Sequence, residues 1–372
     1  MIPIGCPTVG DLEIARVVET LRAGRLTQGV LVEQFEQKFA QTIHSKYAVA
    51  CSSGTAALHL SLVALEIHPG EEVLVPDLTY VAVANAVSYL GAVPVLVDVD
   101  PESWNIDLQD AERKITPRTV AMIAVHLYGV PCDLDQLVDF AGRHSLMLIE
   151  DAAEALGGFS EKSHCGTRGI CGTFSFYANK IITTGEGGMV VTDSEDIDRQ
   201  LRQLRGQGVN REKGNYYHEC LGFNYRLTEL QAALGLSQLD QLPLFISLRQ
   251  KVINAYRREL KDIVTSPVRE GTAPWLFTGI LPIGIPITVA KLLVQAGIET
   301  RPIFTPLHQL PMYHSDQDFL VSTDIYSRGL SFPTYPSLSL SDVKYISDET
   351  RRIVMEHWVE YPNQARFFEQ RP

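Results

Sequence analysis

Long uninterrupted hydrophobic runs are missing from this chain of 372 residues. Its longest apolar stretch, residues 81–97, is interrupted by Asn85, Ser88, Gly91 and Pro94, whereas a membrane-spanning helix needs about 20 consecutive apolar residues. The first residues also lack the basic segment followed by a long apolar run that marks a secretory signal. We therefore expect a cytoplasmic protein that has no contact with a membrane.

Positive charge is in short supply. The chain has 32 Lys and Arg against 44 Asp and Glu, which gives a formal net charge of −12. A general nucleic-acid binder neutralises phosphates with clustered Lys and Arg, so the charge argues against that class. A small anionic ligand needs only a local positive pocket and is compatible with this composition.

Cysteine is also sparse, and its spacing does not match metal motifs. No two of the six cysteines have C-x-x-C spacing; they are Cys6, Cys51, Cys132, Cys165, Cys171 and Cys220. The HExxH motif is absent as well, and residues 166–172 lack the Gly-Lys-Ser/Thr ending of a P-loop. We therefore expect free thiols in a reducing compartment and no metal site.

What remains is the composition of a folded globular protein, with 45% hydrophobic and 20% charged residues. Its length suggests about two domains. Apolar runs alternate with segments of helical spacing, which predicts a parallel sheet between helices. The predicted strands are 71–77, 92–100, 119–129 and 145–151, and the predicted helices between them are 79–91, 108–115 and 134–145.

The pattern changes near residue 235. Residues 234–263 read as one long helix with a break near Pro243, and shorter alternating pieces follow. We expect an α/β fold, with a large domain at 1–235 built on a mostly parallel central sheet between helices. A smaller C-terminal α+β domain follows at 236–372. Ligands of such sheets collect at the carboxyl ends of the strands.

A candidate anion site begins at "SSGTAALHLSLVAL", residues 52–65. The stretch reads as a turn followed by an amphipathic helix, with Ser53, Gly54 and Thr55 at its start. Free backbone N–H groups and the helix dipole favour an anion there, and Gly54 lets the backbone approach closely. A plain Ser/Thr helix cap is the alternative.

Two charged residues follow later in the chain, each in an apolar setting. Asp151 ends an apolar strand, and it either caps a helix or partners a cationic ring nitrogen that keeps it ionised. Lys180, in "TFSFYANKIITTGEGGMVVTD", is expected at the end of a buried strand. A surface lysine is the alternative. A lysine that forms Schiff bases must be desolvated or lie beside another cation, and these apolar flanks supply desolvation.

The set Gly54-Thr55, Asp151, Ser175 and Lys180 suits pyridoxal phosphate (PLP). The helix start and Ser175 hold a phosphate, Asp151 keeps a pyridinium nitrogen protonated, and Lys180 makes the Schiff base. Each signal is weak alone, but together, in chain order on the strand ends of an α/β sheet, they predict a PLP enzyme.

Nearly the whole chain resembles the sugar-nucleotide aminotransferases, PLP enzymes of the aspartate aminotransferase fold type. The matching stretches are "SSGTAALHLSL", "VPDLTYVAVANAVSYLGAVPVLVDVD", "IEDAAEALGG", "FSFYANKIITTGEGGMV", "GFNYRLTELQAALG" and "TRPIFTPLHQLPMY". The resemblance makes the large domain the PLP-binding domain and assigns Lys180 to the Schiff base. It implies further cofactor contacts from Gly54, Thr55, Tyr80, Asp151, Glu154 and Ser175.

The resemblance also implies a homodimer with shared active sites. Asn224 would reach the PLP phosphate of the neighbouring subunit, and His308 would enter the partner's site near the sugar. Arginines in site-forming segments could grip a diphosphate, with surface ion pairs as the alternative; they are Arg226, Arg301 and Arg328.

The reaction that the resemblance implies moves an amino group from L-glutamate to C4 of a nucleotide-linked 4-keto-6-deoxy sugar, with GDP-4-keto-6-deoxymannose as the best candidate. The loop at Phe304 and Thr305 is expected to vary with substrate, so UDP- or dTDP-linked 4-keto or 3-keto sugars stay open. A PLP-dependent sugar dehydratase would carry histidine in place of Lys180. A non-catalytic PLP-binding regulatory relative would not need both Lys180 and Asp151.

Overall fold

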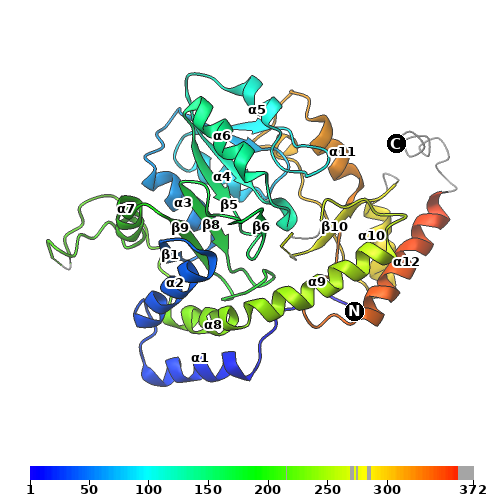
Figure 1. Cartoon of the computed structure of the whole chain (residues 1–372), viewed down its shortest axis with the longest axis horizontal. Helices are drawn as coiled ribbons and strands as arrows, with labels where there is room; N and C mark the ends of the chain where they lie inside the picture. Colours follow the sequence, from blue (N-terminus) through cyan, green and yellow to red (C-terminus); the bar gives the residue numbers. More distant parts are fainter. Residues whose placement is uncertain (215, 269–271, 274, 283–285, 359–372) are drawn as a thin grey trace.

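A computed structural model of the chain describes residues 1–214, 216–268, 272–273, 275–282 and 286–358. Figure 1 shows a large sheet wrapped by helices beside a smaller sheet, which packs on the helices α9 (Leu242–Glu259), α10 (Pro286–Gln295) and α12 (Leu340–Trp358). This is the predicted α/β fold with a smaller C-terminal α+β domain. Residues 359–372 of that predicted domain lie outside the described residues.

The large sheet has seven strands in the order β1-β9-β8-β5-β4-β2-β3. Strand β9 runs antiparallel to both of its neighbours, and the remaining pairs are parallel. The strands span Tyr47–Cys51 (β1), Glu72–Pro76 (β2), Val93–Val97 (β3), Thr119–Val125 (β4), Met147–Asp151 (β5), Cys171–Ser175 (β8) and Gly188–Thr192 (β9). The four predicted strands therefore exist as β2, β3, β4 and β5.

Alternate residues of these strands pack into two different cores. Leu74, Met122 and Leu148 join the helices α5 (Leu108–Lys114) and α6 (Leu134–His144). Val73 and Ile123 belong instead to the main core, which includes α3 (Gly54–Ala64) and α4 (Ala82–Ser88). Helices thus cover both faces, as period-two burial along parallel strands requires.

Further helices pack around the β1 side of the sheet. Helix α2 packs on β1, α7 packs on α3 and β1, and α8 packs on both α1 and α2. Their bounds are Asp11–Ala23 (α1), Val30–Ile43 (α2), Glu195–Arg205 (α7) and Glu229–Asp240 (α8). The chain between α7 and α8 projects away from this body (Figure 1). A short hairpin, β6 (Phe159–Ser160) with β7 (Ser163–His164), lies between β5 and β8 in the sequence.

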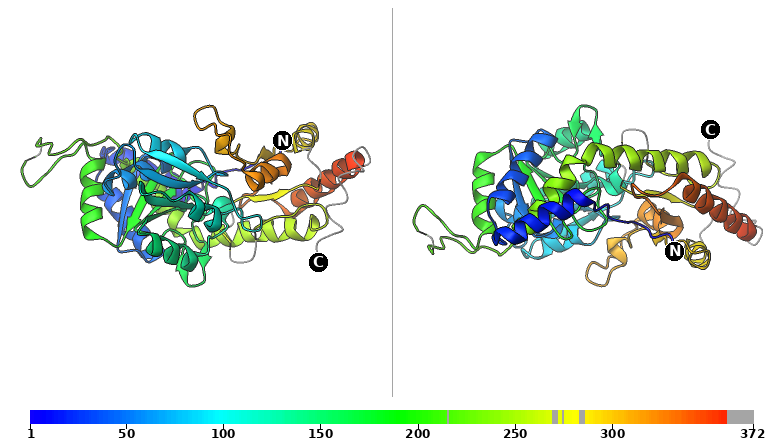
Figure 2. Two further views of the ribbon diagram at one scale, coloured as in Figure 1. Left: turned by 90° about the horizontal axis from the view of Figure 1, so that it is seen from above. Right: turned by 90° about the horizontal axis from the view of Figure 1, so that it is seen from below.

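The predicted long helix is two helices. Helix α8 ends at Asp240 and α9 (Leu242–Glu259) begins after Gln241, with Pro243 in its first turn, where proline lacks no needed N–H. Helix α9 carries the chain to the small sheet, and Figure 2 shows α9 and α12 extending side by side from the large sheet.

The small sheet has the order β10-β12-β11, with both pairs antiparallel. Its strands are β10 (Phe277–Ile280), β11 (Arg301–Pro302) and β12 (Gly329–Phe332). The helical elements of this part of the chain are α10 (Pro286–Gln295), the 3-10 turn η2 (Leu307–Gln309), α11 (Leu320–Arg328) and α12 (Leu340–Trp358). A separate apolar core fills this part, around Tyr256, Phe277 and Phe332. The start of the chain also reaches it, because the Ile2 N–H donates to the Gly297 carbonyl at 2.7 Å.

None of the described helices is long and apolar enough to cross a membrane. All six cysteines are free, with Cys6 and Cys220 exposed and the others buried.

Candidate active site

A cavity of about 500 Å³ opens at the carboxyl ends of the large-sheet strands, where it meets the segment around β10 and β11. Many of the residues that the sequence singled out line it: Gly54, Thr55, Tyr80, Asp151, Glu154, Ser175, Lys180 and Arg301. Residues far apart in the sequence therefore share one site because parallel strands end at one edge of the sheet.

The N-terminus of α3 forms one wall of this cavity. Ser53 is the N-cap, and its hydroxyl accepts the Ala56 N–H at 3.0 Å, so the cap interpretation holds for that residue. The next two N–H groups of a helix start have no partner within the helix. A Cβ added to Gly54 would lie 2.9 Å from the Cβ of Ser175, so only glycine lets the helix start approach the end of β8.

Asp151 is the last residue of β5 and is only 7% exposed. One oxygen accepts the Ala153 N–H at 3.0 Å. Burial raises the pKa of this carboxyl, while the Ala153 N–H and the nearby Lys180 amine act in the opposite direction. A cation placed against Asp151 would favour its ionised form.

Lys180 lies in a turn and not at a strand end. Strand β8 stops at Ser175, and the Lys180 N–H donates to the Tyr177 carbonyl at 2.9 Å. The turn returns the lysine side chain to the cavity, where it is 13% exposed. Its Nζ is 3.4 Å from Oε1 of Glu154 and 3.9 Å from the ring centroid of Trp275. The desolvation expected for this amine is present.

Glu154 is the second buried carboxyl of the site, at 6% exposure. Its Oε2 accepts the Tyr128 N–H at 2.8 Å, and its Oε1 faces Lys180. Burial raises the pKa of Glu154, and the positive charge of Lys180 partly opposes this. The Glu154 carboxyl and the Lys180 amine therefore lie side by side in a wall of the cavity that is shielded from water.

Tyr80 and Arg301 lie among the cavity-lining residues with larger exposure. Tyr80 is 56% exposed, and its ring centroid is 5.5 Å from that of Phe304. Arg301 Nη2 is 3.8 Å from Glu299 Oε1, with half of its side chain in solvent. Both side chains are free enough to adjust to a bound molecule.

The remaining predicted residues do not line the cavity of their own chain. Asn224 and Arg226 are exposed, on a segment whose Tyr225 carbonyl accepts the Ser52 N–H at 2.9 Å. Arg328 pairs with Asp324 of the same helix, which is the surface ion pair that we named as its alternative.

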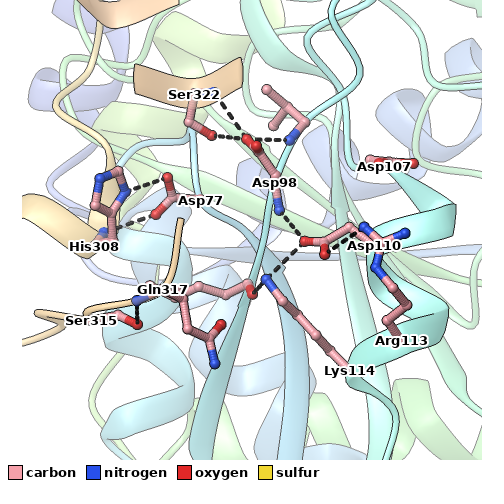
Figure 3. Close-up of polar contacts among 12 residues, drawn as sticks. Asp77, Asp98, Asp107, Asp110, Arg113, Lys114, His308, Ser315, Gln317 and Ser322 are labelled. Atoms are coloured by element: carbon pink, nitrogen blue, oxygen red, sulfur yellow. Dashed lines mark hydrogen bonds and ion pairs between the residues drawn. The ribbon is translucent and has the colours of Figure 1, made fainter. Parts of the chain in front are cut away.

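His308 is held by Asp77, which follows β2 (Figure 3). Asp77 accepts the His308 backbone N–H at 2.8 Å and lies 2.7 Å from its Nδ1. The imidazole also stacks on Phe319, with centroids 4.8 Å apart. His308 therefore has a fixed orientation, outside the residues that line the cavity.

The sequence did not predict Tyr128 and Trp275 as parts of an aromatic wall. Tyr128 stacks between Trp275 and Phe304, with centroids 6.0 and 5.4 Å away, and all three line the cavity. Trp275 and Phe304 come from the segments before β10 and after β11. No spacing links them to Tyr128, and Tyr128 contacts Glu154 through its backbone, which no residue type reveals.

The residues present fit PLP. The close approach at Gly54 leaves the α3 start and Ser175 at one wall, suited to a phosphate. Asp151 suits a pyridinium nitrogen, and the amine of Lys180 suits the aldehyde carbon. The cavity supplies an anion site, a buried acid and a desolvated amine together.

Comparison with known proteins agrees with this geometry. Residues 7–351 match the model of the DegT/DnrJ/EryC1/StrS aminotransferase family. The chain is 42% identical to a GDP-perosamine synthase of Caulobacter vibrioides, over 92% of this chain and 95% of that protein. It is 40% identical to a GDP-perosamine synthase of Escherichia coli O157:H7, over 93% of this chain and 97% of that protein.

A solved structure shares the fold. It is a mutant of a GDP-4-keto-6-deoxymannose-3-dehydratase with bound GDP-perosamine, with a TM-score of 0.88 and 27% identity, covering 94% of this chain and 100% of that chain. The chain belongs to the DegT/DnrJ/EryC1/StrS aminotransferase family and is a PLP-dependent sugar aminotransferase.

Proposed function

We propose that this enzyme transfers the amino group of L-glutamate to C4 of GDP-4-keto-6-deoxymannose and so makes GDP-perosamine. The observation that carries the proposal is the identity of 42% and 40% to two GDP-perosamine synthases over more than nine-tenths of the chain. Lys180 and Asp151, which the reaction needs, face the same cavity.

Lys180 is the proposed proton carrier. Bound PLP supplies the electron sink that lets the Cα–H bond of glutamate break. The Nζ of Lys180 takes the proton from that carbon and, in the second half-reaction, delivers a proton to C4 of the sugar. Its contacts with Glu154 and Trp275 hold the amine inside the cavity for both transfers.

Other cavity residues bind and orient. In this proposal Asp151 would hold the charge opposite a ring nitrogen, and Glu154 would contact a ring hydroxyl. Tyr80 offers a ring face. The phosphate contacts that we propose come from Gly54, Thr55 and Ser175.

We also propose a homodimer with shared active sites. Asn224 is exposed outside the cavity of its own chain, which suits a side chain that serves a neighbouring subunit. His308 keeps its proposed role in the partner's site, but in this chain its side chain is 13% exposed and bonded to Asp77, so that role rests on the family resemblance alone. We further propose that residues 1–235 form the large PLP-binding domain and residues 236–372 the small domain, and that the protein is cytoplasmic.

Arginines are the proposed diphosphate ligands. Arg301 lines the cavity and is half exposed, so it is free to turn toward a ligand. Arg226 would act near the start of α3. Arg328 would first have to leave Asp324, which makes it the weakest of the three candidates.

The test is a comparison of kcat/KM for GDP-, UDP- and dTDP-linked 4-keto-6-deoxy sugars, with glutamate as the donor. We expect the GDP-linked sugar to be preferred by at least about tenfold, equivalent to about 1.4 kcal/mol of transition-state binding. The glutamate half-reaction, measured alone, is the control because it does not involve the nucleotide. A tenfold preference for a UDP- or dTDP-linked sugar would overturn the GDP assignment and leave the aminotransferase activity intact.

A further inference from the structure

Trp275 presents its ring to the amine of Lys180. The Nζ is 3.9 Å from the ring centroid, and the tryptophan is 4% exposed. Trp275 lies two residues before the start of β10, so it reaches the lysine from the C-terminal part of the chain. A cation over an aromatic face is attracted by the ring quadrupole, most strongly for tryptophan and where water is excluded.

The backbone fixes this ring relative to Lys180. The indole Nε1–H donates to the Asn179 carbonyl at 3.0 Å. Arg249, a buried residue of α9, donates to the carbonyls of Trp275 at 2.8 Å and Lys180 at 3.2 Å. Burial lowers the pKa of Arg249 to about 10, and no carboxylate among the described residues pairs with it. The ring therefore stays beside Lys180 wherever the amine points.

The second neighbour of the amine is a carboxyl that belongs to the same wall. Glu154 Oε1 is 3.4 Å from Nζ, and Glu154 Oε2 accepts the N–H of Tyr128. Tyr128 in turn stacks on Trp275, with an interplanar angle of 10°. Charged groups of the described residues that line the cavity or lie against this turn are Asp151, Glu154, Glu186, Arg249 and Arg301.

We propose that Trp275 is a positioning residue that holds the amine of Lys180 as an ammonium against its ring whenever that amine is not bonded to the cofactor. The inference rests on the role proposed above for Lys180. When the proton leaves the α-carbon of glutamate and the N–H bond forms on Nζ, the lysine becomes a cation. The ring face stabilises that product and keeps it within reach for the return transfer.

The test measures the protonation of Lys180 in the full-length enzyme, with the cofactor in its pyridoxamine form so that the lysine amine is free. Acetic anhydride acylates only neutral amines, and mass spectrometry reports the labelling rate of Lys180. The rate at pH 7.5, divided by the plateau rate reached at high pH where the amine is fully neutral, gives a ratio that cancels differences in access. In Trp275→Leu we expect this ratio to rise by at least about fivefold, equivalent to about 1 kcal/mol of lost cation–π attraction.

Trp275→Phe is the matched control because it keeps an aromatic face. Its ratio should lie between the native value and that of Trp275→Leu. Equal ratios in the native and leucine proteins would overturn the proposal. Equal ratios in the phenylalanine and leucine proteins would also overturn it, because lost volume would then explain the change.

Ring fluorination covers the case in which Trp275→Leu does not fold. Fluorinated tryptophans inserted at position 275 keep the shape of the ring and progressively withdraw its π density. The labelling ratio should rise with each added fluorine, and a flat series would overturn the proposal. Borohydride reduction and peptide mapping test the role of Lys180 separately: an adduct on another lysine would refute that role while the labelling ratio still reports the contact.

Discussion

At the scale of single residues, the two carboxyls of the turn after β5 differ in their neighbours. Asp151 is bonded to the Ala153 N–H and has space in front of it, whereas Glu154 is bonded to the Tyr128 N–H and faces Lys180. Burial raises the pKa of both carboxyls, and the positive charge of Lys180 opposes this at each of them. Glu154 contacts the Lys180 amine directly, and Asp151 lines the cavity in which a ligand would lie.

Asp151→Asn should separate charge from shape at this position. The amide keeps the size and the acceptor for the Ala153 N–H, but it cannot hold a ring nitrogen protonated. We expect turnover to fall by at least about tenfold, or about 1.4 kcal/mol in the barrier, with PLP still bound. Steady-state kinetics and cofactor absorbance measure the two quantities, and a near-normal rate would mean that Asp151 is only structural.

The residues found from the sequence are those whose type and local context carry their chemistry. Gly54, Asp151, Ser175 and Lys180 stand at motif positions, and all line the cavity. Trp275 and Tyr128 could not be found this way, because one acts through a ring face from a distant segment and the other through its backbone. The spacing of residues along the chain does not predict roles that depend on where the fold places a ring or a backbone N–H group.

At the scale of elements, the β6–β7 hairpin supports the turn that carries both carboxyls. His164 of β7 is 4% exposed, and its Nε2 accepts the Gly157 N–H at 2.9 Å. Its Nδ1 lies 2.7 Å from the Cys165 carbonyl, which fits a neutral ring with the proton on Nδ1. Burial lowers the pKa of His164 to about 4, so the hairpin depends on a neutral imidazole.

This histidine predicts a loss of stability in acid. The unfolded chain binds a proton below the ordinary histidine pKa of 6.5, but the folded chain resists it until about 4. Stability therefore falls as the pH drops through that window, by about 2 kcal/mol between pH 7.5 and pH 5. Urea unfolding of cofactor-free protein measures it. His164→Gln should be less stable at pH 7.5 but approach the native value at pH 5; parallel curves would contradict the prediction.

Another element, α11, is anchored by an aspartate of the large sheet (Figure 3). Asp98, which follows β3, accepts the Val321 N–H at 3.0 Å and the Ser322 N–H and hydroxyl at 2.9 and 2.6 Å. Helix starts leave such N–H groups without partners, so the carboxylate both caps the helix and complements its dipole. The chain between β11 and α11, which carries Phe304 and His308, is thereby tied to the cavity side of the sheet.

Asp98→Ala should loosen this anchor. We expect a loss of about 2 kcal/mol of unfolding free energy and faster amide hydrogen exchange at residues 320–323. Asp107→Ala is the matched control, because Asp107 caps α5 by accepting the Gln109 N–H at 2.9 Å. It should lower stability without changing exchange in α11. Equal exchange at 320–323 in both variants would show that Asp98 does not hold the helix.

Element boundaries show where a sequence pattern stops being informative. The predicted strand 119–129 ends at Val125, because the chain turns into η1 (Leu127–Gly129) and Tyr128 adopts a φ of 52°. Those residues are apolar and buried like a strand, so hydrophobicity could not mark the turn. The sequence also did not predict that β9 runs antiparallel, since the alternation of apolar segments and helices does not specify the direction of a strand.

At the scale of the whole molecule, the active site draws on both sheets. The large sheet contributes Asp151 and Ser175 at its strand ends, and the C-terminal part contributes Trp275, Arg301 and Phe304. Family resemblance, and not periodicity, predicted that Arg301 and the loop at Phe304 belong to this site; it did not predict Trp275. In the proposed homodimer, Asn224, which is exposed in its own chain and bridges to Gly206, would complete the site of the neighbouring subunit.

Subunit mixing tests this last contribution. A Lys180→Ala chain and an Asn224→Ala chain are each expected to form a nearly inactive homodimer. If Asn224 serves the neighbour's phosphate, a heterodimer has one site that carries both defects and one that carries neither. Co-expression with two different affinity tags isolates the heterodimer, which should recover roughly half of the native activity per dimer because one of two sites is intact. If Asn224 serves its own subunit, each site of the heterodimer carries one defect and no activity returns. Failure to recover activity in a proven heterodimer would therefore refute shared sites and leave the Lys180 assignment untouched.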